Sequence, residues 1–268
     1  MNLLAFDTST DVMSIAVQRG AASGAPSAGG AGALQTWQHT AAGGAQASTT
    51  LIPAIQWLMQ QAQLNFCDLD AIAFGRGPGS FTGLRTACSV AQGLAFGAGV
   101  PVLPVDSLLA VAEEARHQQS LLMHAGHAGH ACQADQRQPR AQFRVLAVLD
   151  ARMDEVYAAY YEFNSELCIQ VAGYSLIRPE DMVLEDGWAM AGNAFAAYGD
   201  RLPVGKAAPI HALPTASAML RLAPALMAAG HAVPAEQALP VYIRDKVAKT
   251  TQERAQEKLS KAVAGVAP

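Results

Sequence analysis

Short apolar runs alternate with polar or glycine-rich segments through the first 105 residues of the chain. The apolar runs 3–6 and 12–17 flank a cluster of small polar residues, and this pattern predicts a β-hairpin. A stretch rich in glycine, alanine and serine follows, within which one strand is expected at 34–39. Two further apolar runs, 70–74 and 100–105, predict strands, so this part of the chain supplies material for a sheet.

A helix is predicted after the glycine-rich stretch. Ser48 or Thr49 is the expected N-cap, and Pro53 is tolerated if it falls in the first turn. Apolar residues recur on one stripe at helical spacing, namely Leu51, Ile52, Ile55, Leu58, Met59 and Ala62. Trp57 lies on the opposite side among glutamines, where it either covers its neighbours or anchors a partner protein.

Two more helices are expected, at 82–96 and 107–116. The first of them carries Gly83, Ala87 and Ala91 at four-residue spacing, which permits close approach of another element. The stretch 86–105 contains no charged residue, but its glycines and prolines would break a membrane-spanning helix. We therefore expect a buried helix and a buried strand there, and no membrane segment.

The opening pattern returns in the second half of the chain. An apolar run over 145–149 leads into Asp150, and a second run follows at 156–161. Aligning the two halves superposes Asp7 on Asp150 and Asp11 on Asp154. The repeated order of strand, aspartate and second strand predicts two related α/β lobes.

These patterns divide the chain into an N-terminal lobe over 1–104 and a C-terminal lobe over 105–243. The second lobe contains a low-complexity segment at about 117–141, rich in glutamine and histidine, which is expected to be a surface insertion. The segment 244–268 carries six Lys or Arg residues and three Asp or Glu residues, and it is expected to be a basic mobile tail.

Composition narrows the classes of function. The 268-residue chain has 18 Lys and Arg residues against 22 Asp and Glu residues, a formal charge of −4. Phosphate binding depends mainly on lysine and arginine, so this balance argues against a chain that grips nucleic acid alone. Four widely spaced cysteines form no disulfide framework, which is typical of reduced thiols in the cytoplasm.

The glycine-rich run 75–85 is the most distinctive segment. Its glycines, the helix that follows and two arginines could cradle an anion, but neither the P-loop nor the dinucleotide-binding motif fits. A tight strand-to-helix turn is the alternative, and the residue types leave both open. The candidate residues of this loop are Arg76, Gly77, Gly79, Ser80, Thr82 and Arg85.

The two hairpin turns supply a second set of candidates. The first turn could hold a metal-bound phosphate, with Asp7 reaching the metal through water and Thr8 and Ser9 bonding to phosphate oxygens, and Asp150 would face them from the other lobe. Aspartate and serine also build ordinary turns, so each hairpin alone is ambiguous. No H-E-x-x-H or H-x-x-x-H motif occurs, and no metal site is predicted.

Four segments together, 4–9, 75–85, 150–157 and 240–244, resemble the bacterial TsaB (YeaZ) family. The resemblance implies an actin-like (ASKHA) α/β fold of two related lobes, each with a mixed sheet flanked by helices. It also implies a part in making threonylcarbamoyladenosine beside the anticodon of tRNA.

In that family the TsaB chain is a non-catalytic subunit without a cofactor. It forms a heterodimer with its paralogue TsaD, which transfers the threonylcarbamoyl group, and the ATPase TsaE docks on the pair. Transfer RNA is then met only through the complex, and the compartment is the cytoplasm.

The chain departs from actin-like enzymes at two places. TsaD-like chemistry uses an H-x-x-x-H metal helix, which is missing here. The segment around Gly192 only faintly matches the adenosine loop of actin-like ATPases, so Asp7, Thr8, Ser9, Asp150 and Gly192 are expected to form a degenerate nucleotide cleft. Chains of the family often carry a histidine at the start of the first helix, where this chain has Ala47 at the head of 47–53.

The main hypothesis is a scaffold subunit that contacts TsaD through the two helices of the first lobe and forms a homodimer when TsaD is missing. The candidate interface residues are Leu51, Ile55, Trp57, Leu58, Ala87, Val90, Ala91 and Leu94, some of which must fill the core of the lobe. The alternative is a free-standing actin-like ATPase or small-molecule kinase that uses Asp7 and Asp150 with magnesium. A third possibility is that the basic tail contacts tRNA phosphates.

Overall fold

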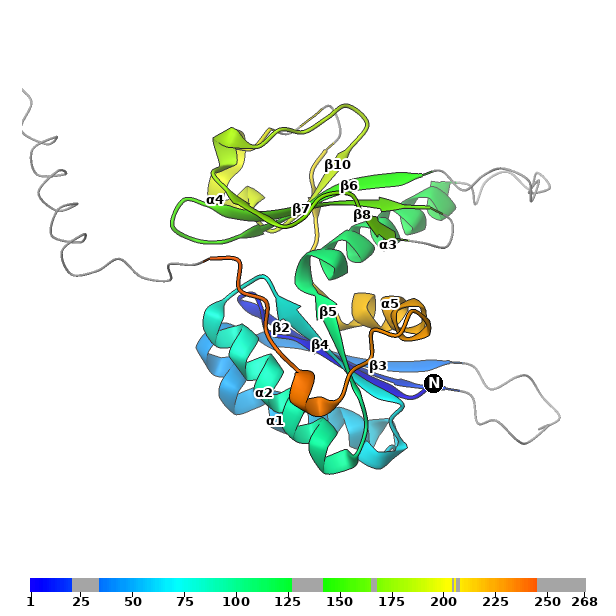
Figure 1. Cartoon of the computed structure of the whole chain (residues 1–268). Coiled ribbons are helices and arrows are strands. Elements are labelled where there is room, and N and C mark those ends of the chain that lie inside the picture. The colour runs from blue at the N-terminus through cyan, green and yellow to red at the C-terminus, as the bar shows by residue number, and fades with distance from the viewer. Residues whose placement is uncertain (21–33, 127–141, 165–167, 204, 206–207, 245–268) are drawn as a thin grey trace, which may run out of the picture.

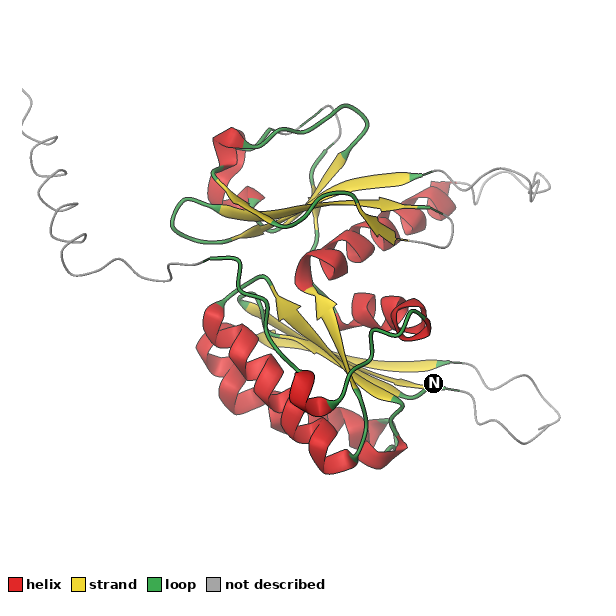
Figure 2. Ribbon diagram, in the orientation of Figure 1, coloured by secondary structure: helices red, strands yellow, loops and turns green. Residues whose placement is uncertain are grey.

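The computed structural model describes residues 1–20, 34–126, 142–164, 168–203, 205 and 208–244. Two α/β lobes lie one above the other, with two helices, α3 and α5, between them (Figure 1). Each lobe is built on its own sheet, and helices flank both sheets (Figure 2). The predicted fold class of two α/β lobes is confirmed.

The sheet of the first lobe has the strand order β3-β2-β1-β4-β5. Its strands are β1 (Leu3–Asp7), β2 (Val12–Arg19), β3 (Gln35–Ala42), β4 (Ala71–Gly77) and β5 (Val102–Asp106). The predicted hairpin is confirmed, because β1 and β2 pair antiparallel. β1, β4 and β5 run parallel, so they need crossover connections, and helices supply them.

Helices α1 (Ala47–Gln61) and α2 (Phe81–Ala98) cover one face of this sheet. The predicted stripe is buried except for Ile52, whose surface is 43% exposed. The predicted N-cap is wrong: Gln46 precedes the first helical residue, and the Ser48 hydroxyl donates instead to the carbonyl of Ala45. Pro53 accordingly lies in the second turn rather than in the first.

Helix α5 (Ala216–Ala228) covers the other face of the first sheet. Its buried residues, among them Met219 and Ala223, share a core cluster with Leu3 and Ala73. The assignment of all of 105–243 to the second lobe is therefore wrong, because the chain returns to the first lobe to bury a sheet face that would otherwise be exposed. The single turn η5 (Ala235–Gln237) also packs on α2.

The second sheet has the strand order β11-β10-β6-β7-β8, and β9 pairs with β7. Hairpin β6–β7 repeats hairpin β1–β2, and Asp7 and Asp150 each end the first strand of their hairpin. The repeat predicted from the sequence is thus present in the structure. The strands are β6 (Phe143–Asp150), β7 (Val156–Phe163), β8 (Cys168–Gln170), β9 (Ser175–Ile177), β10 (Ala189–Gly192) and β11 (Ile210–His211), and the short helix α4 (Phe195–Tyr198) follows β10.

Helix α3 (Ser107–Gly126) is ten residues longer than predicted. Its first half is buried against the second sheet, while Leu121, Leu122 and Met123 near its end are more than half exposed. Residues 117–126 are therefore helical rather than part of a surface insertion, and 127–141 lie outside the described residues. Within the described part of the chain, no helix is both long and apolar enough to cross a bilayer.

Polar contacts tie the two lobes together. Arg221 of α5 pairs with Glu113 and Glu114 of α3 at 2.9 and 2.7 Å. Glu113 is almost fully buried, so its charge is compensated inside the junction. Within the first lobe, Arg76 near the end of β4 pairs at 2.5 Å with Asp106 at the end of β5, directly before the chain enters α3.

Candidate functional site

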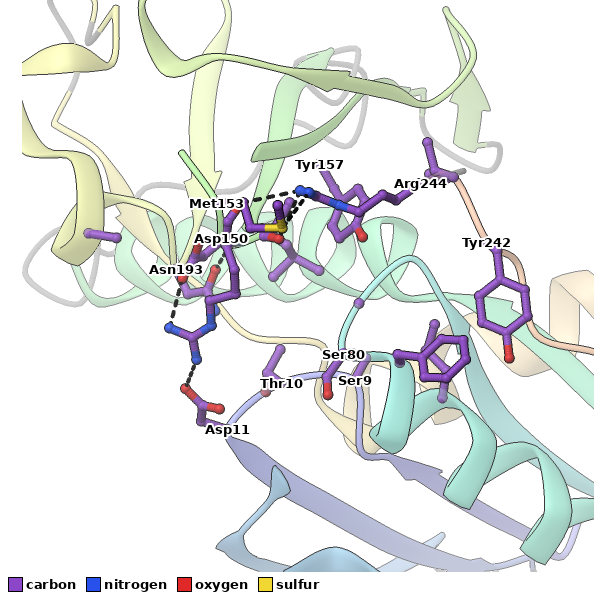
Figure 3. Close-up of a pocket in the computed structure, with 18 of the residues that line it drawn as sticks. Ser9, Thr10, Asp11, Ser80, Asp150, Met153, Tyr157, Asn193, Tyr242 and Arg244 are labelled. Carbon is purple, nitrogen blue, oxygen red and sulfur yellow. Dashed lines mark hydrogen bonds and ion pairs between the residues drawn. The ribbon is translucent and has the colours of Figure 1, made fainter. Parts of the chain in front are cut away.

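The two hairpin turns face each other across a cavity of about 520 Å³, which is within the usual range for small-molecule sites (Figure 3). The first lobe supplies the β1–β2 turn and the start of α2, and the second lobe supplies the β6–β7 turn and the region of α4. A segment at the end of the described chain, residues 239–244, completes the wall and is called the strap. The lining residues are Ser9, Thr10, Asp11, Gly79, Ser80, Phe81, Leu84, Leu149, Asp150, Ala151, Arg152, Met153, Tyr157, Asn193, Ala196, Ala197, Val241, Tyr242, Ile243 and Arg244.

Asp7 does not face this cavity, contrary to the sequence prediction. It is fully buried, and its carboxylate accepts hydrogen bonds from the backbone and hydroxyl of Ser9 at 2.7 and 2.6 Å. A further hydroxyl, that of Ser107, donates to its second oxygen at 3.0 Å. Burial raises the pKa of Asp7 to about 6, although these donors oppose the change. The Asp7 carboxylate thus stabilises the β1–β2 turn through these hydrogen bonds.

Thr8 is also turned away from the cavity. It is fully buried, and its hydroxyl donates to the carbonyl of Gly83 at 2.7 Å. Ser9 does line the cavity, but its hydroxyl is already bonded to Asp7. Of the three polar residues expected to meet a phosphate, only one therefore reaches the cleft.

The glycine-rich loop is held against this turn by close packing. A Cβ on Gly83 would lie 1.8 Å from the carbonyl oxygen of Thr8, and one on Gly79 would lie 2.6 Å from Ser9. The backbone amide of Ser80 donates to the carbonyl of Ser9 at 2.7 Å. These contacts favour the tight-turn interpretation of the loop, because its glycines accommodate the protein's own backbone.

The two arginines of this loop do not line the cavity. Arg76 is bound to Asp106, and Arg85 lies over the ring of Phe81 with its guanidinium carbon 3.8 Å from the ring centroid. Thr82 shares the outer surface of α2 with Arg85. Gly77 has a φ of 111° and packs against Leu84 and the strap, so only Gly79 and Ser80 of the predicted set reach the cleft.

Asp150 does line the cavity, as expected, but its carboxylate is engaged. It accepts hydrogen bonds from the amide of Arg152 at 2.7 Å and the hydroxyl of Tyr198 at 2.8 Å. Gly192 is buried, and a Cβ there would lie 1.7 Å from the carbonyl oxygen of Val148. Its neighbour Asn193 is the residue that faces the cavity, and it accepts from the amide of Asp150 at 2.9 Å.

An ion pair joins the two hairpin turns across the cleft. The guanidinium of Arg152 lies 2.5 Å from the carboxylate of Asp11 and 3.0 Å from that of Asp150 (Figure 3). These contacts compensate the two acidic side chains of the cavity. No group of three or more histidine, cysteine, aspartate or glutamate side chains in the described residues could hold a metal ion.

The β6–β7 turn has an unusual backbone. Arg152, Met153 and Asp154 all have positive φ, at 60°, 54° and 66°, a conformation that non-glycine residues rarely adopt. Arg201 binds Asp154, and Arg244 binds the carbonyls of Ala151 and Arg152 at 3.1 and 3.2 Å. A backbone conformation of this kind is unfavourable by itself, and the contacts of Arg201 and Arg244 hold it in place.

Arg244 belongs to the strap that closes the cleft. It pairs with Glu155 at 2.6 Å, and its side chain is only 12% exposed. On the first lobe, the amide of Val241 donates to the carbonyl of Arg76 at 2.7 Å. Tyr242 accepts from Arg85 at 3.2 Å. The strap, residues 239–244, therefore spans both lobes, and Arg244 is bound rather than part of a tail; residues 245–268 lie outside the described residues.

Among the cavity residues that the sequence analysis did not propose are Asp11, Arg152, Asn193 and Arg244. Asp11, Arg152 and Arg244 lie in segments that carried the family resemblance or the internal alignment, and Asn193 follows the candidate residue Gly192. The signal was present, but the pairing of Arg152 with Asp11 links turns 141 positions apart, which no local pattern shows.

The structure also divides the candidate interface residues. Leu51, Ile55, Leu58, Ala87 and Ala91 are buried in the lobe's own core and offer no surface, so their assignment to an interface is wrong. The apolar stripes of both helices pack against the sheet beneath them and therefore leave no surface for a partner. Trp57 is 49% exposed, and Val90 and Leu94 are partly buried, so these three keep accessible surface.

The fold and the site define a class of protein before any relative is considered. Two related α/β lobes with facing hairpin turns form an actin-like fold, and the ion pair of Arg152 with Asp11 bridges the cleft between them. The comparisons with known proteins agree. The chain is similar to YeaZ from Pseudomonas aeruginosa, with a TM-score of 0.70 and 32% identity over 90% of this chain and 99% of that one.

Curated relatives give the family. The chain is 30% identical to the tRNA threonylcarbamoyladenosine biosynthesis protein TsaB of Escherichia coli, over 92% of this chain and 96% of that protein. It is 31% identical to TsaB of Haemophilus influenzae, over 92% and 95%. The family model of TsaD, tRNA N6-adenosine threonylcarbamoyltransferase, matches residues 35–138. The chain belongs to the TsaB family and takes part in threonylcarbamoyladenosine biosynthesis.

Proposed function

We propose that this chain is a non-catalytic subunit that forms a heterodimer with TsaD and supports the transfer of the threonylcarbamoyl group to tRNA. One observation carries the proposal: the outer face of α1 and α2 is accessible, partly apolar and nearly free of charge. Arg85 is the single charged residue in the two helices. A solvated helix face normally carries several charges, so this composition favours a protein partner.

The outer face is shaped for close approach. Phe96 is 82% exposed and Ile52 is 43% exposed. Gly93 and Gly97, one helical turn apart on α2, have no heavy atom within 4 Å of the place where a Cβ would be. Glycines on a solvent-facing helix surface cost helix stability, and they allow another helix to pack closely.

The cleft supports a role without chemistry. Asp7, the residue that an actin-like phosphotransferase would need near the nucleotide, is buried behind its own turn. Arg152 compensates the charges of Asp150 and Asp11, and Asp150 also accepts a hydrogen bond from Tyr198, so the arrangement disfavours a magnesium ion at these carboxylates. The two lobes are further tied by Arg221 and Arg244, which opposes the opening and closing that a nucleotide cycle requires.

The kinship with TsaD suggests how the pair would form. The matched region, residues 35–138, includes β3, α1, α2 and β5, so the partner is built on a related first lobe. Related lobes can pair through equivalent helices, as in an isologous interface. TsaE would dock on this pair, tRNA would be met through the complex, and the assembly would work in the cytoplasm.

The experiment is a binding measurement with purified TsaD. Gly93→Leu adds a bulky side chain to the outer face of α2, and we expect binding to TsaD to weaken about tenfold or more. Gly173→Leu is the matched control, because Gly173 lies in the second lobe and also has open space around its Cβ position. Titration calorimetry and co-elution measure both variants.

The proposal fails if Gly93→Leu binds TsaD as tightly as the wild-type chain does, or if the wild-type chain never co-elutes with TsaD. Micromolar binding of ATP with Mg²⁺ to the isolated chain, abolished by Asp150→Ala, would instead favour the free-standing ATPase.

A further inference from the structure

Another cavity, of about 370 Å³, lies near the place where β5, α3 and α5 meet (Figure 1). The end of β5, the first turn of α3, the end of α5 and the turn η5 contribute to its wall. It shares no lining residue with the cavity between the hairpin turns. We call it the junction cavity, and its size is sufficient for a small molecule.

An ion pair forms the polar part of the wall. Arg76 and Asp106 both line the junction cavity, and the guanidinium Nε lies 2.5 Å from the carboxylate Oδ1. The other oxygen of Asp106 accepts a hydrogen bond from the hydroxyl of Tyr174, which belongs to the second lobe. A guanidinium has two further nitrogens, and each carboxylate oxygen can accept more than one hydrogen bond. The pair can therefore bind further groups of both signs.

This ion pair is better shielded from water than the pair in the cleft. The side chains of Arg76 and Asp106 are 37% and 14% exposed, whereas those of Arg152 and Asp11 are 67% and 77% exposed. Charges in partly buried surroundings are screened less by water and salt. Of the two pairs, Arg76 and Asp106 are therefore better placed to recognise a small charged ligand.

The hydrogen bonding around Arg76 and Asp106 is incomplete. Among the described residues, the buried hydroxyl of Tyr161 has no hydrogen-bond partner. Burial, with smaller contributions from Tyr174 and Asp106, raises the pKa of Tyr161 well above its usual value, so this hydroxyl lies near the same cluster. A polar cluster that serves structure alone is normally fully bonded. This cluster keeps hydrogen-bonding capacity for another molecule.

Aliphatic side chains form another part of the wall. Leu109 of α3, Leu226 of α5 and Val233 all line the junction cavity, and each is only partly buried by its own neighbours. A short aliphatic group in the cavity would remove their remaining apolar surface from water, which is favourable. The cavity thus combines a charged pair with an apolar surface.

We propose that the junction cavity binds a free α-amino acid with a small aliphatic side chain. The α-carboxylate binds the guanidinium of Arg76, the α-ammonium binds the carboxylate of Asp106, and the side chain contacts the leucines and the valine. An α-amino acid carries its two charged groups on one carbon atom. It therefore matches a protein ion pair whose charged atoms are in direct contact, and charges of opposite sign alternate around the complex.

A ligand with a single charge fits this wall less well. A phosphate or a simple carboxylate would lie against Asp106 as well as Arg76, and an amine would lie against Arg76 as well as Asp106. Like charges in partly buried surroundings are unfavourable, so each of these ligands loses part of what it gains. The inference uses no contact with TsaD and does not depend on the proposed function.

Titration of the full chain with L-valine, followed by calorimetry, tests the site. The heat should show saturable binding with one site per chain. N-acetyl-L-valine lacks the positive charge and L-valinamide lacks the negative charge, so each should bind about tenfold more weakly or worse. D-valine keeps both charges but exchanges the positions of the side chain and the hydrogen, and it should also bind more weakly.

Asp106→Asn tests the position of the ligand. It removes the negative charge but keeps an oxygen acceptor for Tyr174, and circular dichroism shows whether the variant is folded. L-valine should bind about tenfold more weakly or worse to this variant, whereas N-acetyl-L-valine should bind more tightly than to the wild type because the repelling charge is gone. Asp11→Asn makes the same substitution at the ion pair in the cleft, so it distinguishes the two cavities.

Absence of saturable L-valine binding at millimolar concentrations overturns the inference. Equal binding of L-valine, N-acetyl-L-valine and L-valinamide to the wild-type chain also overturns it, and this comparison needs no variant to fold. Loss of L-valine binding in Asp11→Asn but not in Asp106→Asn would place the amino acid in the cleft and would contradict the assignment to the junction cavity.

Discussion

Substitution of Asp7 distinguishes most clearly between a structural role and a chemical role of this residue. Its pKa is raised by burial to about 6 from an ordinary value of 3.8. Each unit corresponds to about 1.4 kcal/mol, so the ionised carboxylate costs the folded state about 3 kcal/mol relative to the unfolded chain. Asp7→Asn keeps the size and one oxygen acceptor of the side chain but removes the titration.

The sign of the pH dependence follows from proton binding. Between about pH 4 and pH 6 the folded chain holds a proton on Asp7 that the unfolded chain has released, so raising the pH lowers the free energy of unfolding. The stabilising effect of the raised pKa is fully present below about pH 4 and is lost as the pH rises through 6. Asp7→Asn should therefore gain stability relative to the wild type across this window, by about 3 kcal/mol in total.

Urea denaturation at pH values from 4 to 7.5, followed by circular dichroism, measures this difference. Asp200→Asn, at an exposed position, is the control and should follow the wild type at every pH. Wild-type and Asp7→Asn curves that stay parallel with pH would refute the assignment of Asp7 as a buried, destabilised carboxylate. Loss of a measurable ATP affinity in Asp7→Asn would refute its structural role.

Two pairs of substitutions test the packing of the glycine-rich loop and the contacts of the strap. Gly83→Ala places a Cβ 1.8 Å from the backbone of Thr8 and should cost several kcal/mol, whereas Gly93→Ala meets nothing within 4 Å and should stabilise α2 by up to about 1 kcal/mol in thermal or urea unfolding. Arg244→Ala removes a mostly buried ion pair and two carbonyl contacts, so it should cost about 2–3 kcal/mol. Arg152→Ala removes an exposed pair with Asp11 and a contact with the mostly buried Asp150, and it should cost about 1 kcal/mol; equal losses for the two arginines would contradict the strap.

Local patterns predicted the elements of this fold well, because hairpins and amphipathic helices depend on spacing that the sequence displays. Both hairpins and the buried stripe of α1 are present as predicted. Helix α3 is predicted to end too early because the low-complexity residues after 117 are assigned to an insertion. Glutamine, alanine and leucine are nevertheless good helix formers, and the helix continues through them.

Such local patterns do not predict which elements pack together over long distances in the sequence. Nothing in the spacing of Met219 and Ala223 shows that α5 covers the first sheet rather than the second. An aspartate at a hairpin turn has the same sequence pattern whether it faces a cleft, as Asp150 does, or is buried, as Asp7 is. The glycines of the loop likewise accommodate either a phosphate or a neighbouring backbone, and only the position of Thr8 decides between them.

The central claim is that this chain contributes a surface rather than reactive groups. Threonylcarbamoyl transfer to tRNA by TsaD and TsaE, with the wild-type chain, Asp150→Asn or Gly93→Leu added at equal concentration, tests it most directly. Asp150→Asn should support transfer at close to the wild-type rate, while Gly93→Leu should lose most of it at concentrations near the wild-type dissociation constant for TsaD. Loss of transfer with Asp150→Asn together with full transfer with Gly93→Leu would contradict the account.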